Sequence, residues 1–296
     1  MKKANGPRPL IFGEVLFDRF PEGSVVLGGA PFNVAWHLQA FGAAPLFVSR
    51  VGDDPLGRSI RDTMRDWDMD ASGLQLDSAH PTGTVEVSIE NDEPSFDIVD
   101  ERAYDFVAAG DLPPLQHVPL LYHGSLALRN PDNRQALERI RRTSGAPVFV
   151  DVNLRPPWWD KASVTEMLQT ARWAKLNDAE LDALAPAGDN LMSRTGALQK
   201  DCDLELVIVT LGAEGAVART RDGALQQVAP EPNLRLVDTV GAGDAFSAVT
   251  LLGVLREWDL GTTLLRAQSF AGAVVGLRGA IPASREFYTP FLIDWS

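Results

Sequence analysis

DTVGAGDAF, residues 238–246, is the stretch of sequence on which the fold assignment depends. It places two glycines, Gly241 and Gly243, at the start of a long apolar segment with a helical pattern. Glycines there allow close backbone approach, and the N–H groups of a first helical turn can bind anionic oxygens. Asp244 falls in the same turn, where a carboxylate suits the helix dipole and can accept a proton from an attacking hydroxyl. The sequence therefore predicts an anion-binding turn of Gly241, Ala242 and Gly243 beside a carboxylate base.

Two familiar glycine-rich nucleotide motifs do not fit this stretch. Phe246 occupies the third glycine position of a dinucleotide-binding fingerprint, and no second βα unit follows to carry the ribose-binding acid. No lysine follows a glycine anywhere in the chain, which excludes a Walker-type phosphate loop. The remaining alternative is a capped helix with a structural aspartate.

Short apolar runs alternate with helical patterns along most of the chain, which predicts βα units on a largely parallel sheet. The expected helices cover residues 31–41, 55–69, 131–142, 163–172 and 262–275. We also expect a short strand just before the glycine turn, in residues 234–240. Ligands of such sheets bind at the carboxyl ends of the strands, so the segments DVN (151–153), KLN (175–177) and VTLG (209–212) should converge.

Residues 82–99 change the pattern to two alternating strands around a turn at Asn91 to Pro94. A hairpin this small cannot bury its own face, so it should lie on another part of the molecule. We predict a lid, formed by about residues 14–28 and 80–106, inserted in a single domain over residues 1–296. A second copy of the chain that covers the edges of the lid would make a homodimer.

Composition narrows the classes of partner and location. The chain has 27 basic and 40 acidic residues, a formal net charge of −13, and no basic run, so we expect no nucleic-acid partner. No apolar stretch is long enough to cross a bilayer and none has signal-peptide form, so we expect no membrane partner and a cytoplasmic location. Cys202 is the single cysteine, and the four histidines have no zinc-ligand spacing.

Two motifs together resemble the signatures of the ribokinase-type (PfkB) carbohydrate kinases. DTVGAGDAFSA, residues 238–248, resembles the C-terminal signature of that family, and GGAPFNVA, residues 28–35, resembles its N-terminal one. Intermediate segments such as DVNLR (151–155) agree, so the resemblance spans nearly the whole chain. It implies a Rossmann-like α/β fold, a three-layer sandwich with a small β-sheet lid, which binds ATP and Mg²⁺.

The resemblance places Asp18, Gly28, Gly29 and Asn33 around the sugar. Their chemistry fits, because Asn33 offers donors and an acceptor and Asp18 is a bidentate acceptor for two hydroxyls. The alternative is an ordinary glycine-rich turn followed by an asparagine on a helix. Arg155 adds a planar cation that suits a phosphate oxygen or a substrate carboxylate.

On the nucleotide side, the resemblance assigns four residues to ATP: Asn177, Thr210, Gly212 and Gly215. Glu180 would hold Mg²⁺ through water. Asn177 and Glu180 also have the spacing of a capping box, and both interpretations can hold together. Gly215 fits a plain strand turn nearly as well. Asp238 matches the position that holds a monovalent cation, which would be K⁺.

The predicted reaction is transfer of the γ-phosphate of ATP to a sugar hydroxyl, with Asp244 accepting the hydroxyl proton and the turn at residues 241–243 stabilising the phosphate. Fructokinase-like members resemble residues 151–159 and 123–131 most, which favours fructose. Kinases for 2-keto-3-deoxygluconate, ribose or a nucleoside are alternatives. A regulator that binds sugar or nucleotide without chemistry is the alternative of another class.

Overall fold

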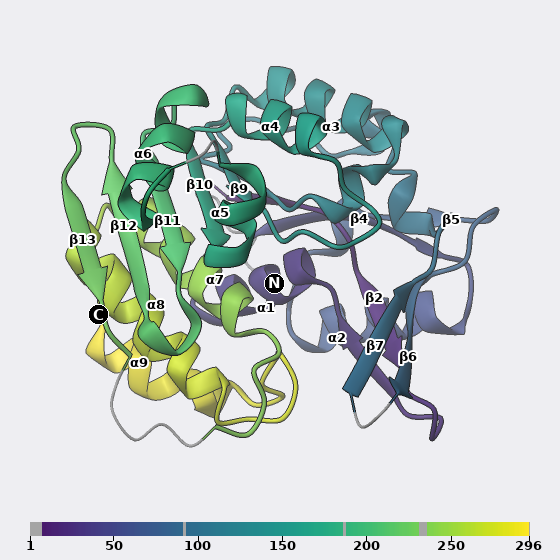
Figure 1. The fold of residues 1–296 in the computed structure, drawn as a ribbon. Helices are drawn as coiled ribbons and strands as arrows, with labels where there is room; N and C mark the ends of the chain where they lie inside the picture. The colour runs from purple at the N-terminus through teal and green to yellow at the C-terminus, as the bar shows by residue number, and fades with distance from the viewer. Residues whose placement is uncertain (1–7, 91–92, 186–187, 231–235, 296) are drawn as a thin grey trace.

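The chain folds into one large sheet with helices on both faces and a second, small sheet beside it (Figure 1). The structure is a computed structural model that describes residues 8–90, 93–185, 188–230 and 236–295. The turn predicted at Asn91 to Pro94 includes Asn91 and Asp92, which lie outside the described residues.

The main sheet has the strand order β13-β12-β11-β10-β9-β8-β1-β4-β5. Its strands are β1 (Leu10–Phe12), β4 (Leu46–Gly52), β5 (Leu74–Asp77), β8 (Leu121–His123), β9 (Val148–Asp151), β10 (Trp173–Asn177), β11 (Leu206–Thr210), β12 (Ala216–Thr220) and β13 (Leu225–Val228). Neighbours from β5 through β11 are parallel, whereas β11, β12 and β13 are antiparallel. Apart from the edge strand β5, the parallel strands are largely apolar because both of their faces are covered.

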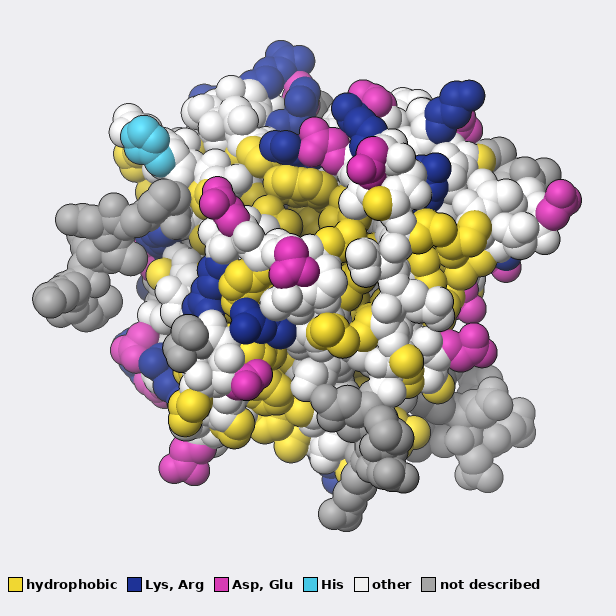
Figure 2. All heavy atoms as spheres, turned by 90° about the vertical axis from the view of Figure 1, so that its left-hand side faces the viewer, with side chains coloured by type: hydrophobic (Ala, Val, Ile, Leu, Met, Phe, Trp, Pro, Cys, Tyr) yellow, Lys and Arg dark blue, Asp and Glu magenta, His cyan; other side chains and the backbone are white. Residues whose placement is uncertain are grey.

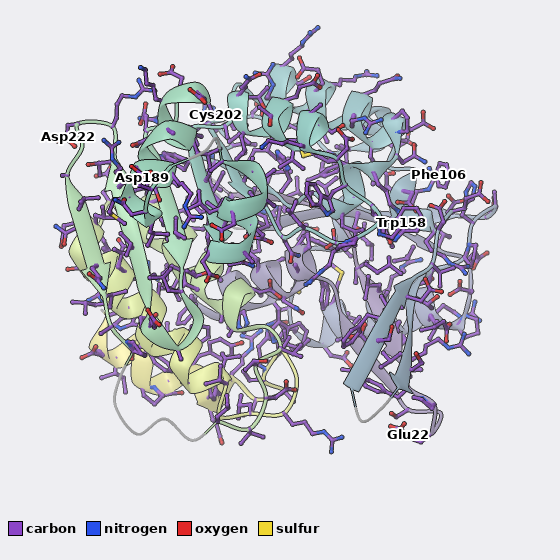
Figure 3. The ribbon with its side chains drawn as sticks, viewed as in Figure 1. Glu22, Phe106, Trp158, Asp189, Cys202 and Asp222 are labelled. Carbon is purple, nitrogen blue, oxygen red and sulfur yellow. The ribbon has the colours of Figure 1, made fainter. Side chains whose placement is uncertain are left out.

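Two separate hydrophobic clusters, one on each face of the main sheet, make the molecule three-layered. One cluster joins the sheet to α1 (Ala30–Ala40), α2 (Pro55–Asp66), α7 (Ala242–Leu255) and α8 (Leu260–Val274). The other joins it to α3 (Pro131–Ser144), α4 (Lys161–Gln169), α5 (Asp178–Leu184) and α6 (Leu191–Asp201). Cys202, which follows α6, is buried in the second cluster (Figure 3). This arrangement confirms the predicted α/β sandwich.

The second sheet has the order β3-β2-β6-β7 and comes from two distant parts of the chain. Its strands are β2 (Leu16–Arg19), β3 (Val25–Gly28), β6 (Gly83–Glu90) and β7 (Glu93–Ile98). The turn between β2 and β3 carries Glu22 at the far tip of this sheet (Figure 3). The register pairs Asp18 with Val26 and Val85, and Val85 with Ile98, so these four side chains share one face.

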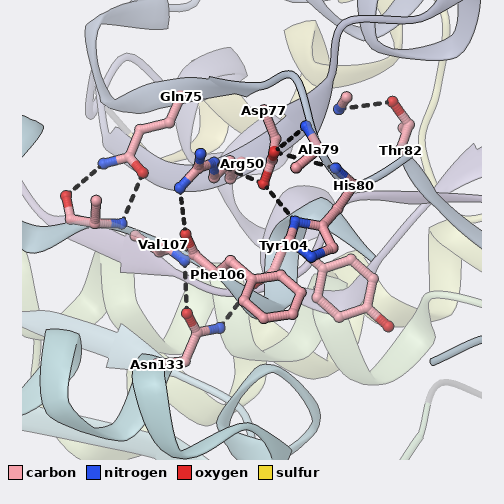
Figure 4. A network of polar contacts seen from close by, with 12 residues as sticks. Arg50, Gln75, Asp77, Ala79, His80, Thr82, Tyr104, Phe106, Val107 and Asn133 are labelled. Atoms are coloured by element: carbon pink, nitrogen blue, oxygen red, sulfur yellow. Dashed lines mark hydrogen bonds and ion pairs between the residues drawn. The ribbon is translucent and has the colours of Figure 1, made fainter. Parts of the chain in front are cut away.

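A polar network fastens the segment that follows β7 to the main sheet (Figure 4). Arg50 donates from Nη1 to the carbonyl of Phe106 at 2.7 Å and lies 3.1 Å from Asp77 Oδ2 through Nε. The ring of His80 contacts Asp77 Oδ2 through Nδ1 at 3.0 Å and stacks on the Phe106 ring at 3.8 Å. Asn133 donates to the carbonyl of Tyr104 at 2.7 Å. The segment that follows β7 is therefore held against the core by side chains of the main sheet and of α3.

The predicted elements are confirmed along most of the chain, with one error before the glycine turn. Of the strand expected in residues 234–240, the described part, residues 236–240, forms no strand. Val237 and Asp238 both donate backbone N–H groups to the carbonyl of Val275, so they bond to the end of a helix and not to a sheet. The β12–β13 hairpin was not predicted, although Asp222-Gly223 at its turn is a common hairpin signal.

The distribution of charged side chains on the surface agrees with a sequence that has no basic run. On the face shown in Figure 2, basic and acidic side chains are interspersed and form no continuous basic area. Within the ranges that the structure describes, no helix is both long and apolar enough to cross a membrane.

Candidate active site

The first turn of α7 is shaped by a glycine that no other residue can replace without strain. Gly241, which precedes α7, has a φ of 81°, and a Cβ on it would lie 2.4 Å from the Cβ of Ala280. Among the described residues, the backbone N–H groups of Gly241, Gly243 and Asp244 have no protein acceptor. Such free N–H groups at a helix N-terminus form an anion-binding site.

Asp244 contacts the residue that the N-terminal motif contributes to the site. Asn33 on α1 donates from Nδ2 to Asp244 Oδ2 at 2.8 Å, which joins residues 211 positions apart. Part of Asp244 reaches the surface, but its carboxyl is crowded by protein atoms, and this desolvation raises its pKa to about 6. Asp151 also raises this pKa, while the Asn33 contact and the charges of Lys175 and Arg155 lower it. A carboxylate with this pKa is ionised at neutral pH and is a better base than an exposed one.

A buried ion pair lies directly behind the first turn of α7. Lys175 Nζ on β10 is 2.9 Å and 3.0 Å from the two carboxylate oxygens of Asp151 at the end of β9. Asp151 Oδ2 also accepts from Ser247 Oγ on α7 at 2.6 Å and from the Tyr122 hydroxyl at 3.3 Å. Lys175 Nζ is 3.7 Å from the point where a Cβ on Gly243 would sit. Neither charge of the pair was predicted as a site residue.

The residues predicted around the sugar form one region beside Asp244. Gly29 precedes α1 with a φ of 108°, and a Cβ on it would be 2.7 Å from the carbonyl of Glu14. Burial raises the pKa of Asp18, and the charge of Arg155 lowers it. Glu14 was not predicted; burial raises its pKa to about 7, and the charges of Asp244 and Arg155 both act on it. Arg155 thus lies among the acidic groups of this region.

Asn177 and Glu180 form a reciprocal capping box at the start of α5. Asn177 Oδ1 accepts from the Glu180 N–H, and Glu180 Oε2 accepts from the Asn177 N–H, both at 2.8 Å. Glu180 Oε1 accepts from the Leu154 N–H at 2.8 Å, and burial raises the pKa of Glu180. In the part of the chain that is described, no three His, Cys, Asp or Glu side chains cluster as a metal site. Both carboxylate oxygens of Glu180 therefore already accept backbone hydrogen bonds, and its role in holding Mg²⁺ through water stays a prediction.

Thr210, Gly212 and Gly215 follow the end of β11 in different environments. Thr210 pairs with Asn177 in the sheet, so these two predicted nucleotide residues lie side by side. A Cβ on Gly212 would meet nothing within 4 Å. A Cβ on Gly215 would lie 1.9 Å from the carbonyl oxygen of Val228, so the hairpin itself requires glycine there. The nucleotide role of Gly215 stays a prediction beside this structural one.

Asp238 links two loops near the glycine turn. Its Oδ1 accepts from the Val240 N–H and its Oδ2 from the Gly279 N–H, both at 3.0 Å. The carboxylate therefore holds these loops together, and its role in binding K⁺ stays a prediction.

Comparisons with known proteins agree with this geometry. The model of the pfkB family carbohydrate kinases matches residues 9–286. A fructokinase of Klebsiella pneumoniae is 34% identical, in an alignment that covers 92% of this chain and 94% of that protein. An aminoimidazole riboside kinase of Salmonella typhimurium is 31% identical, in an alignment that covers 92% of this chain and 90% of that protein. A double mutant of the fructokinase of Vibrio cholerae O395, solved with fructose, ADP and a potassium ion, has a TM-score of 0.82 at 28% identity; the alignment covers 96% of this chain and 97% of that one.

Proposed function

Because the chain belongs to the pfkB family of carbohydrate kinases, we propose that it transfers the γ-phosphate of ATP to a hydroxyl of fructose. Phosphotransfer to a sugar hydroxyl follows from the family, whereas fructose as the acceptor is our proposal. It is supported by the fructokinase similarity over 92% of the chain. The structural observation that carries the reaction is the contact between Asn33 and Asp244, which joins the sugar and phosphate motifs at one point.

In the proposed reaction, Asp18, Gly29 and Asn33 orient the sugar so that one hydroxyl faces Asp244. Asp244 takes the hydroxyl proton as the oxygen bonds to the γ-phosphorus, and the bond from that phosphorus to the bridging oxygen of ADP breaks. A loose transition state requires mostly alignment and charge stabilisation, so a base with a pKa of about 6 is sufficient.

The free N–H groups of Gly241 and Gly243 would bind the oxygens of the phosphoryl group in transfer. Bound Mg²⁺ would supply charge neutralisation on the phosphates, and Glu180 is the residue suited to hold it through water. Asn177 and Thr210 lie side by side at the edge where the nucleotide would bind. We also propose that Asp238 binds a monovalent cation, which would be K⁺.

A comparison also favours a second candidate acceptor of the phosphoryl group. The aminoimidazole riboside kinase covers the chain as fully as the fructokinase does, at 31% against 34% identity. A nucleoside-like riboside is therefore the second candidate acceptor.

We would measure coupled ADP production with MgATP across fructose, aminoimidazole riboside, ribose, 2-keto-3-deoxygluconate, glucose and adenosine. The expected result is a kcat/KM for fructose at least about tenfold above that for every other acceptor. A higher value for the riboside, or for another acceptor, would overturn the assignment of fructose and name the acceptor that replaces it.

We propose that the second sheet is the lid of the sugar site and also the interface of a homodimer. Its strand β2 carries Asp18, whose face also carries Val26 and Val85. On the same face, Val26 is 41% exposed and Phe96, which pairs with Val87, is 54% exposed. An exposed apolar rim on a small sheet with open edges suits contact with a second copy of the same sheet.

Light scattering at about micromolar concentration, where specific interfaces remain associated, should give twice the mass of one chain. Phe96→Glu should give the mass of one chain, because a charge would replace the apolar contact. Ser95→Glu is the matched control, since Ser95 is exposed on the opposite face of the same strand. A monomeric wild type, or a Phe96→Glu protein that stays dimeric, would contradict the interface.

A further inference from the structure

We propose that the buried Lys175–Asp151 ion pair positions the first turn of α7 for phosphoryl transfer and adds a favourable dipole behind the phosphate site. This inference rests on the proposed site, in which the turn at residues 241–243 binds the transferring phosphate. It concerns positioning residues, because neither side chain of the pair is placed in contact with the substrate.

The contacts orient the pair along the helix. Lys175 Nζ lies against Gly243 in the first turn, 3.7 Å from the point where its Cβ would be. Asp151 accepts from Ser247, which is four residues and about one helical turn further along. The positive end of the pair therefore lies at the N-terminus of α7 and the negative end lies deeper. This direction matches that of the helix dipole, whose positive end binds anions.

A buried ion pair of this kind is expected to add little to the stability of the fold, which indicates another role. The side chains of Lys175 and Asp151 are only 6% and 5% exposed, so both charges have lost most of their hydration. Buried ion pairs often contribute no more stability than apolar residues of similar volume. Here the Ser247 and Tyr122 hydroxyls complete the hydrogen bonds of Asp151, which fixes the pair rigidly against the helix. Rigid, preorganised charge is what stabilises a transition state.

The two charges of the pair also act in opposite senses on the pKa of each of the two proposed functional carboxyls. Asp151 raises the pKa of Asp244 and of Glu180, and Lys175 lowers both. The pair is thus close enough to act electrostatically on both the proposed base and the residue proposed to hold Mg²⁺ through water. Among the described residues, the charged and polar groups that act on Asp244 include Asn33 on α1, Asp151 on β9, Lys175 on β10, Arg155 after β9, Glu14 after β1 and Tyr122 on β8.

The test compares Lys175→Met, Asp151→Asn and the double variant, using the acceptor with the highest kcat/KM. The double variant leaves no unpaired buried charge and should fold. Its kcat should fall about 10- to 100-fold, with KM for both substrates within about threefold of wild type. A purely structural pair predicts instead that the double variant recovers both stability and kcat.

The single variants should move the acid limb of kcat in opposite directions. Wild-type kcat should decrease as the pH drops below about 6, because Asp244 must be ionised to accept a proton. Lys175→Met removes the cation that lowers this pKa, so its limb should move to higher pH. Asp151→Asn removes the anion that raises it, so its limb should move to lower pH. Glu14 is present in every variant, so the comparison with wild type isolates the pair.

Arg172→Met/Glu205→Gln is the matched control. Arg172 and Glu205, 2.6 Å apart, immediately precede β10 and β11, so this ion pair lies at the amino ends of the strands, away from the proposed site. Its kcat should stay within about twofold of wild type. A folded Lys175→Met/Asp151→Asn protein with wild-type kcat, together with folded single variants whose acid limbs do not move, would overturn the inference alone. If the single variants do not fold, the double variant decides. A wild-type kcat for Asp244→Asn in the same assay would overturn the proposed site and this inference with it.

Discussion

Asp244→Asn should lower kcat by about 10²- to 10⁴-fold, the range typical for loss of a general base. A carboxamide has nearly the same shape, and its oxygen can still accept from Asn33 Nδ2, as Asp244 Oδ2 does at 2.8 Å. It cannot take the hydroxyl proton. KM for ATP and for the sugar should therefore change little, and the loss should be confined to kcat.

The same variant should be more stable than wild type at high pH. Burial raises the folded-state pKa of Asp244 from 3.8 to about 6, so the folded protein binds this proton more tightly than the unfolded chain. The stability that this preference contributes is present at pH below the unfolded value and is lost as pH rises through about 6. Asp244→Asn removes the cost of burying the charge, so its Tm should exceed that of wild type at pH about 8, with the difference shrinking toward pH about 4.

Kinetics and thermal unfolding on the same samples separate the two effects. Asp132→Asn is the matched control, since Asp132 is an exposed carboxylate in the first turn of α3. It should leave both kcat and the pH dependence of Tm unchanged. A normal kcat for Asp244→Asn would remove this residue from the chemistry, and a lower Tm at high pH would contradict the buried, destabilising charge.

The sequence was sufficient for the layers of the fold and for the position of the anion-binding turn. Apolar runs such as residues 206–210 have the pattern of strands buried on both faces. Gly241 before a long apolar segment indicates the start of a helix from the local sequence alone. The short strand expected in residues 234–240 failed for the converse reason. Its apolar residues bond to the end of α8, and no local pattern distinguishes that from pairing in a sheet.

The composition of the candidate site was harder to predict, because it depends on which residues meet. Lys175 was noted only as part of a predicted strand, although a lone lysine among apolar residues was a usable signal of a buried partner. Its partner Asp151 is 24 positions away, and only the parallel neighbours β9 and β10 bring the two together. Glycines raise a different difficulty. Gly215 was assigned to the nucleotide, yet the Val228 carbonyl leaves no room for a Cβ there, which is by itself a sufficient reason for glycine.

Gly241→Ala should damage both stability and turnover. At a φ of 81°, a side chain strains the backbone, and the new Cβ would lie 2.4 Å and 2.5 Å from the Cβ and Cα of Ala280. Left-handed strain of about 1–2 kcal/mol and overpacking of about 1–3 kcal/mol should together lower the free energy of unfolding by about 2–5 kcal/mol. Relief of the clash would shift the first turn of α7, so that the N–H groups of Gly241 and Gly243 no longer point at the phosphate. A loss of about 10²- to 10³-fold in kcat is expected from misplaced donors of this kind.

Gly145→Ala separates backbone strain from the loss of the phosphate site. Gly145 ends α3 with a φ of 63°, and a Cβ on it would meet nothing within 4 Å. Alanine there should cost about 1 kcal/mol of unfolding free energy and leave kcat unchanged, because only the backbone preference is affected. Denaturant unfolding and steady-state kinetics of both variants check this. If Gly241→Ala loses stability but keeps wild-type kcat, the turn is only a helix start, and the phosphate must bind elsewhere; a selective loss of kcat places the transferring phosphate at these N–H groups.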